Sequence, residues 1–369
     1  HFEELAAQHG YRIGIASLDA EKSLNALTLP MIEALDAKLK QWAEDERIAC
    51  VLLRGNGPKA FCAGGDVVQL VQQCREHPGE VPPLARRFFA DEYRLDHRIH
   101  TYPKPLLCWA HGHVLGGGMG LMQGAAIRIV TPSSRLGMPE INIGLFPDVG
   151  GSWFLARLPG RLGLFLGLTA AVINARDALD LNLADRFLRD DQQDELLDVL
   201  LQLNWQEQSA MQLNSLLKAL AQEAIGDQPE AQWLPRRAQI DEWLDVGDVR
   251  CAWRALSLLR DHSDPLLSRA GKTLSEGCAP TAHLAREQLQ RARHNGPSPP
   301  AGRARHSRSI LTTPRVAALT RVKSLRGFIS RSAARARQPA ASASATRRAR
   351  KAAGTGVPPS PAITVVTPM

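Results

Sequence analysis

The chain of 369 residues is long enough for two ordinary domains, but single α/β domains of about 200 to 250 residues are also common, so length alone does not decide. Its net charge of +8 is unevenly distributed: residues 295–369 contain 14 Lys and Arg and no Asp or Glu, whereas the first 294 residues contain 31 basic and 37 acidic residues. The body of the chain is therefore acidic, with a net charge of −6.

The six cysteines form no CxxC pair and have no zinc-like spacing, and several lie in apolar runs, which is typical of buried, reduced thiols. No apolar run reaches the roughly 18 to 20 residues that a membrane-spanning helix needs. The N-terminal HFEELAAQHG is neither a signal peptide nor a basic transit peptide. We expect a soluble, cytoplasmic protein without a membrane partner. Because the chain begins at His1 rather than at Met, the sequence leaves open whether a leader peptide precedes it.

Strand and helix signals alternate in the first part of the chain. Two β-rich runs at residues 11–18 and 50–55 flank an apolar-periodic helical segment at about 30–44. A second helical segment at 83–102 precedes a buried strand at 105–112, after which glycines open another helix. This rhythm indicates α/β architecture.

The pattern from residue 150 to residue 294 is nearly all helical, with leucine-rich stretches separated by polar breaks. We predict that it packs as a helical layer over the functional site. The expected division is a core with the active site at 1–190 and a helical C-terminal region at 191–294.

The composition changes abruptly after residue 294. Residues 295–369 are rich in Pro, Ser, Gly and Arg and contain one aromatic residue, Phe328, so we expect a low-complexity basic tail that is disordered. The abruptness favours an out-of-frame translation of a G+C-rich gene from about Asn295. The alternative is a native basic arm that binds nucleic acid.

Two glycine-rich runs carry the main functional signal. They are AFCAGGD at 60–66 and HGHVLGGGMG at 111–120. Their backbone N–H groups would converge on one developing negative oxygen, which makes an oxyanion hole. Two carboxylates follow, Glu140 in MPEINIG and Asp148 in FPDVGG.

These four motifs, in this order over about 90 residues, resemble the crotonase (enoyl-CoA hydratase/isomerase) superfamily, and most closely its 3-hydroxyisobutyryl-CoA hydrolases. The resemblance covers roughly residues 1–294. It implies a spiral of ββα units with a helical C-terminal region. It also implies an acyl-CoA substrate, of which CoA is part, and no metal or redox cofactor. The resemblance leaves open whether the protein forms a homo-oligomer, and nucleic acid is not the expected partner.

The resemblance assigns roles to five residues. The backbone N–H groups of Gly65 and Gly117 would hold the thioester carbonyl oxygen. Glu140 would act as general base on water or as a nucleophile that forms a mixed anhydride. Asp148 would bind the substrate's 3-hydroxyl or position the water, and Glu92 would be a further substrate contact.

Gly120 decides between the reactions of this superfamily. Hydratases of the family use a second glutamate three residues after the oxyanion glycine, and Gly120 takes that position here. We therefore expect hydrolysis of a short 3-hydroxyacyl-CoA, most closely 3-hydroxyisobutyryl-CoA in valine catabolism. An enoyl-CoA hydratase or isomerase is the alternative within the superfamily.

Each carboxylate also has a purely structural interpretation. Glu140 would cap or pair at a strand end, and Asp148 followed by Val-Gly-Gly would be a helix N-cap. Glu92 would form a surface ion pair with one of its arginine neighbours, which are Arg86, Arg87 and Arg94.

The histidines and the other glycine patterns point to no further site. His111 and His113 lack a neighbouring carboxylate or Cys at metal spacing, and the chain has no GxSxG nucleophile elbow, so we interpret this strand-end pair as structural. Asp66 is expected to orient the AGGD turn. No Walker-type loop occurs, which argues against a nucleotide cofactor.

Overall fold

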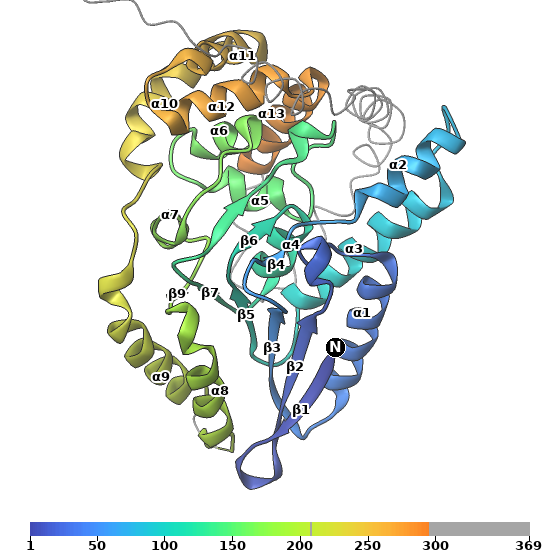
Figure 1. Cartoon of the computed structure of the whole chain (residues 1–369), viewed down its shortest axis with the longest axis vertical. Helices are drawn as coiled ribbons and strands as arrows, with labels where there is room; N and C mark the ends of the chain where they lie inside the picture. The colour runs from blue at the N-terminus through green and yellow to red at the C-terminus, as the bar shows by residue number, and fades with distance from the viewer. Residues whose placement is uncertain (207–208, 295–369) are drawn as a thin grey trace, which may run out of the picture.

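The computed structural model describes residues 1–206 and 209–294, and the predicted basic tail at 295–369 lies outside the described residues. Its larger sheet has six strands in the order β1-β2-β3-β5-β7-β9 (Figure 1). These are β1 (Phe2–Ala6), β2 (Arg12–Leu18), β3 (Ile48–Gly55), β5 (Leu106–Ala110), β7 (Ile127–Val130) and β9 (Arg186–Phe187).

All neighbouring strands of this sheet are parallel except β1 and β2, which are antiparallel. Strands β2, β3 and β5 are almost entirely buried, as expected for the apolar strands of a parallel sheet covered on both faces. The predicted strands at 11–18, 50–55 and 105–112 are thus confirmed. Strand β1 was not predicted.

A smaller sheet brings the two glycine runs together. Its strands are β4 (Ala60–Cys62), β6 (His113–Leu115) and β8 (Arg135–Gly137), paired in parallel in that order. Strand β4 leads directly into one glycine run and β6 into the other. Because the carboxyl ends of parallel strands meet at one edge, both runs leave the sheet on the same side.

The helices of the first half are α1 (Leu29–Glu44), α2 (Val67–Glu76), α3 (Pro83–His100), α4 (Gly117–Gly124), α5 (Gly151–Ala156), α6 (Leu162–Thr169) and α7 (Ala175–Asp180). The helices of the second half are α8 (Gln193–Gln202), α9 (Ser209–Glu223), α10 (Arg237–Leu244), α11 (Val249–Ser257), α12 (Pro265–Glu276) and α13 (Ala279–His294). Both predicted helices of the N-terminal part, at 30–44 and 83–102, are confirmed as α1 and α3. None of the helices in the described part is long and apolar enough to cross a bilayer.

The second half divides into two groups of helices that lie on different sides of the molecule. Helices α10 to α13 pack into the same apolar core as the smaller sheet and α4, and the Cys278 N–H donates to Ile141 O at 3.0 Å, next to Glu140. Helices α8 and α9 instead cover the other face of the large sheet with a separate apolar cluster (Figure 1). Leucine periodicity predicted both sets of helices but not the face that each covers.

Candidate active site

The first glycine turn is held by a bridge to the segment before α1. Leu27 donates from its N–H to Gly64 O at 2.8 Å and accepts at its carbonyl from the Asp66 N–H at 2.7 Å. In a parallel bridge of this kind, the residue between the two partners directs its own N–H to the opposite side. The Gly65 N–H is therefore left for another acceptor. Gly64 has φ +102°, a conformation that glycine adopts without strain.

The second glycine turn begins α4 directly beside the first. A Cβ placed on Gly64 would lie 3.7 Å from the Gly117 N, which is van der Waals contact, so the two turns adjoin each other. Gly117 is the first residue of α4, and N–H groups in the first turn of a helix lack an intrahelical acceptor. Two backbone donors from two turns thus adjoin one another.

Glu140 begins the 3-10 turn η3 (Glu140–Asn142) and is buried, with 4% of its surface exposed. Its Oε1 lies 2.9 Å from the position of a Cβ on Gly116, while Oε2 has no hydrogen-bond partner among the described residues. Burial raises its pKa well above the usual range, and the nearby charge of Asp148 raises it further. The interpretation of Glu140 as a capping or paired residue has no support in these contacts.

Glu92 lies on the inner face of α3 and is 3% exposed. Its Oε1 occupies the space that a side chain on Gly117 would need. The ion pairs between residues of this helix in the described structure are made instead by Asp91, with Arg87 and Arg94. The ion-pair interpretation of Glu92 is therefore wrong. Burial and then the charge of Asp148 raise the pKa of Glu92 well above normal.

Asp148 accepts a hydrogen bond at Oδ2 from the Tyr93 O–H, at 2.7 Å. Burial raises its pKa to about 6, while the bond from Tyr93 acts in the opposite direction. The N-cap of α5 is Gly150, without a side-chain cap bond, so the N-cap interpretation of Asp148 is also wrong. Between them Val149 has φ +42°, a left-handed conformation that is strained for a β-branched residue.

Two residues of this cluster were missed in the sequence, Tyr93 and Asp96. A Cβ on Gly120 would lie 3.0 and 3.1 Å from the two carboxyl oxygens of Asp96, so this carboxyl stands against the glycine of α4. Asp96 follows Glu92 by four residues on the same helix, and that spacing places both on one face. This spacing was the available signal, although the many charges of α3 concealed it.

The remaining predicted residues have local partners. The Asp66 carboxylate accepts from the Val68 N–H at 3.1 Å and caps α2, in agreement with the expected orienting role. His111 is buried, and its Nε2 lies 2.7 Å from Gly57 O, whereas His113 is exposed. Within residues 1–206 and 209–294, no group of three or more His, Cys, Asp or Glu side chains is arranged to hold a metal ion.

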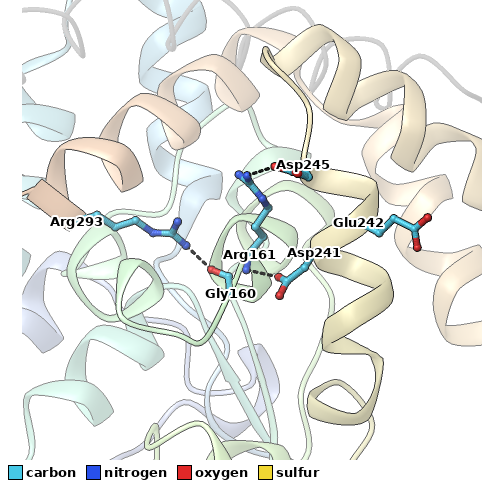
Figure 2. A pocket seen from close by; sticks show the side chains of 6 residues that line it. All are labelled: Gly160, Arg161, Asp241, Glu242, Asp245 and Arg293. Carbon is cyan, nitrogen blue, oxygen red and sulfur yellow. Dashed lines mark hydrogen bonds and ion pairs between the residues drawn. The ribbon is translucent and has the colours of Figure 1, made fainter.

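A surface depression of about 430 Å³ lies elsewhere, between α6, α10 and α13 (Figure 2). Most of its charged groups have protein partners: Arg161 pairs with Asp245 at 2.6 Å, Asp241 accepts from the backbone N–H of Arg161 at 2.6 Å, and Arg293 donates to Gly160 O at 2.5 Å. It contains none of the predicted site residues. The candidate active site is therefore the carboxyl cluster of Glu92, Asp96, Glu140 and Asp148.

The structure is an α/β fold in which two glycine turns lie beside a buried carboxyl cluster, and comparisons assign it to a family. A family model described as enoyl-CoA hydratase/isomerase matches residues 13–298, well over half of the chain. The chain belongs to the enoyl-CoA hydratase/isomerase family.

Individual relatives are similar over different parts. The "3-hydroxyisobutyryl-CoA hydrolase, mitochondrial" of Danio rerio is 42% identical over 178 residues, which are 48% of this chain and 46% of that protein. The "Small ribosomal subunit protein mS47" of Neurospora crassa is 38% identical over 48% of this chain and 35% of its own length. The chain thus spans about half the length, or less, of these curated relatives. A carnitinyl-CoA dehydratase from Mycobacterium thermoresistibile has a similar structure, with a TM-score of 0.73 and 30% identity over 91% of this chain and 89% of that one.

Proposed function

We propose that this protein hydrolyses a short 3-hydroxyacyl-CoA thioester, most closely 3-hydroxyisobutyryl-CoA to 3-hydroxyisobutyrate and CoA, in valine catabolism. The similarity to proteins named as 3-hydroxyisobutyryl-CoA hydrolases supports the substrate. The cytoplasmic location expected from the sequence stays part of this proposal.

In this reaction the thioester carbonyl oxygen accepts hydrogen bonds from the Gly65 and Gly117 N–H groups. Ionised Glu140 takes a proton from a water molecule as that water attacks the carbonyl carbon, and the two N–H groups stabilise the negative oxygen that forms. When the tetrahedral intermediate collapses, the carbon–sulfur bond breaks and the thiolate of CoA takes the proton from Glu140. The products are the free acid and CoA.

The observation that carries this proposal is the state of Glu140. Its carboxyl is buried beside the glycine turns, and Oε2 has no partner among the described residues, so it is free to meet water or an acyl group. The raised pKa makes the ionised Glu140 carboxylate a stronger base than an ordinary glutamate. Gly120 contributes no side chain that would act as the second acid of a hydratase.

The deciding experiment measures thiol release from 3-hydroxyisobutyryl-CoA and hydration of crotonyl-CoA by the same preparation. We expect thiol release by the wild-type protein and its loss in Glu140→Gln. A single turnover in ¹⁸O-labelled water distinguishes the two roles of Glu140: a general base puts the label directly into the product, whereas a nucleophile first yields unlabelled product and a labelled Glu140. Hydration without thiol release would refute the hydrolase.

The hydratase or isomerase alternative is supported by a different observation. The similar structures include proteins described as a dehydratase and an enoyl-CoA hydratase, the latter with a TM-score of 0.63 and 31% identity. In this reaction the carboxyl of Asp96, beside Gly120, would have to supply the missing acid. Rapid hydration of crotonyl-CoA that is lost in Asp96→Asn would favour this function.

The alternative from another class is nucleic-acid binding through the basic tail. It is based on the 14 basic residues at 295–369, outside the described residues, and on the similarity to a protein named as a ribosomal subunit. Binding of RNA should then weaken steeply with salt and disappear when residues 295–369 are deleted. Binding that survives this deletion would refute a role of the tail.

A further inference from the structure

Helix α3 places two carboxyl groups against two glycines of α4. Glu92 stands at Gly117, and Asp96, one turn further along α3, stands at Gly120, one turn further along α4. Since three helical residues rise by about 4.5 Å, Gly120, and with it the Asp96 carboxyl, stands about that far along α4 from the Gly117 N–H. A hydroxyl on the third acyl carbon is separated from the thioester carbon by a span of the same order.

The Asp96 carboxyl has no other use in the described structure. Both of its oxygens are buried, and neither has a hydrogen-bond partner among residues 1–206 and 209–294. Glu140, 4% exposed, has an unpartnered oxygen in the same cluster. Buried polar groups are nearly always paired, so unpaired ones of this kind mark a place that a ligand or water completes.

Asp148 lies near enough to Asp96 to affect its ionisation. The charge of Asp148 raises the pKa of Asp96, after the larger effect of burial. Two carboxyl groups so placed tend to share one proton, as a carboxylic acid beside a carboxylate. Such a pair offers one donor and several acceptors, and a hydroxyl group is both a donor and an acceptor.

We propose that Asp96, together with Asp148, binds the 3-hydroxyl group of the acyl chain and selects hydroxylated acyl groups over their deoxy counterparts. This inference rests on the proposed acyl-CoA function and names a determinant of its substrate class. Gly120 is then required because it leaves room for the Asp96 carboxyl: a side chain at this position would contact both Asp96 oxygens and lie 2.6 Å from the Val149 Cβ.

The experiment uses ligands that cannot be hydrolysed. These are two ketone analogues in which a methylene group replaces the thioester sulfur of 3-hydroxyisobutyryl-CoA and of isobutyryl-CoA, so that they differ only in the hydroxyl. Isothermal titration gives the Kd of each with the wild-type chain. We expect the hydroxylated analogue to bind at least about tenfold more tightly, because an analogue without the hydroxyl leaves buried polar groups unpaired. Equal affinities would overturn the proposal without any variant.

Variants then assign the preference to Asp96. Asp96→Leu should reduce the ratio of the two Kd values about tenfold, whereas Asp96→Asn, which keeps a donor and an acceptor, should preserve it within about threefold. Asp96→Ala replaces the leucine variant if the latter does not fold. Asp91→Asn is the matched control, because Asp91 lies on the same helix and pairs with Arg87 and Arg94.

The outcomes separate this inference from the proposed function. A uniform loss of affinity for both analogues in Asp96→Leu would mean a structural role and would overturn the proposal. A wild-type chain that prefers the hydroxylated ketone, yet releases no thiol from the corresponding thioesters, would refute the hydrolase and retain the role of Asp96.

Discussion

Two clusters of this molecule differ in the groups that surround their carboxylates: the Glu4 cluster, which consists of Glu4, Arg12, Lys38 and Trp42, and the carboxyl cluster beside the glycine turns. At the edge of the large sheet, Glu4 accepts hydrogen bonds from Trp42 Nε1 at 2.7 Å and Lys38 Nζ at 3.1 Å and pairs with Arg12. The bond from Trp42, with the smaller effects of Lys38 and Arg12, lowers the pKa of Glu4. Together Trp42, Lys38 and Arg12 favour the charged carboxylate enough to outweigh the effect of burial on its pKa.

In the cluster beside the glycine turns, no Lys or Arg of the described residues offsets the effect of burial on the pKa values. The pKa values of Glu92, Asp96, Glu140 and Asp148 are all raised, with burial as the first cause of each. Tyr93 supplies the hydrogen bond to Asp148. Buried carboxyl groups without partners cost stability, so a fold retains them where they serve binding or chemistry. The Glu4 cluster stabilises the fold, whereas the carboxyl cluster beside the glycine turns destabilises it.

Glu140→Gln tests this contrast with the largest expected effect. Thiol release should fall by about 10² to 10⁴, the range for loss of a general base, while the free energy of unfolding stays the same or rises because a buried ionisable group is gone. Stopped assays of thiol release and chemical denaturation measure the two. Glu4→Gln should lower the free energy of unfolding and leave thiol release unchanged. Equal losses of stability in both variants would contradict the difference between the two clusters.

Gly120→Glu should be destabilising rather than a route to hydratase activity. Its Cβ would lie 2.6 Å from Val149 Cβ and about 3 Å from the Asp96 oxygens, and overpacking of this kind typically costs about 1 to 3 kcal/mol. Thermal melting and a crotonyl-CoA hydration assay measure the outcome. Gly226→Ala is the control, since a Cβ there meets nothing within 4 Å. A stable variant that hydrates crotonyl-CoA would contradict the steric role given to Gly120.

The two clusters should also respond to pH in opposite directions. The folded-state pKa of Asp148 is about 6 against an ordinary value of 3.8, so Asp148 stabilises the fold below about pH 4 and loses this contribution as the pH rises through about 6. The pKa of Glu4 is lowered from 4.5, so its contribution is present above that pH and is lost on acidification.

Melting temperatures of the wild type, Asp148→Asn and Glu4→Gln between pH 3.5 and 7 test this pair of signs. The advantage of Asp148→Asn over the wild type should grow as the pH rises, and the deficit of Glu4→Gln should shrink as the pH falls. Parallel curves for all three proteins would show that neither carboxyl contributes as described.

Tyr93→Phe should have the smallest effect. Without the hydrogen bond to its carboxylate, the pKa of Asp148 rises, and the acidic limb of the pH profile of kcat/KM should move to higher pH. The loss of rate at neutral pH should be about tenfold, the lower end of the range of about 1.5 to 3 kcal/mol for one hydrogen bond to a charged group. Tyr102→Phe is the matched control, because Tyr102 donates to Leu39 O away from the cluster. An unshifted limb would count against a role of Asp148 in turnover.

The sequence predicted the parts of the fold that have strong local patterns. The buried strands β2, β3 and β5 are continuous apolar runs, and α1 has a clear helical period with a Thr28 N-cap, so both kinds of element were found. The three-residue strands of the small sheet are too short for any pattern to appear. Strand β1, FEELA, is mostly half-buried and lacks the alternation of apolar and polar residues.

The candidate site was predictable where glycine marks it and obscure where a helix supplies it. Gly65, Gly117, Glu140 and Asp148 stand in runs of unusual composition. Asp96 stands in a helix with charged residues on every side, and its place in the cluster depends on the approach of α3 to α4. That approach joins residues distant in the chain, which local patterns do not encode.

Helix α3 supplies Glu92, Tyr93 and Asp96 from a single stretch of 18 residues that begins at Pro83 and ends before Thr101. The donors at the two glycine turns come from other elements. Under the proposed function, most of the side chains that would contact the acyl chain therefore come from one helix, with Asp148 added from the segment before α5, whereas the backbone donors belong to the two glycine turns. A library confined to α3 would change which acyl groups are accepted while the backbone donors stay in place.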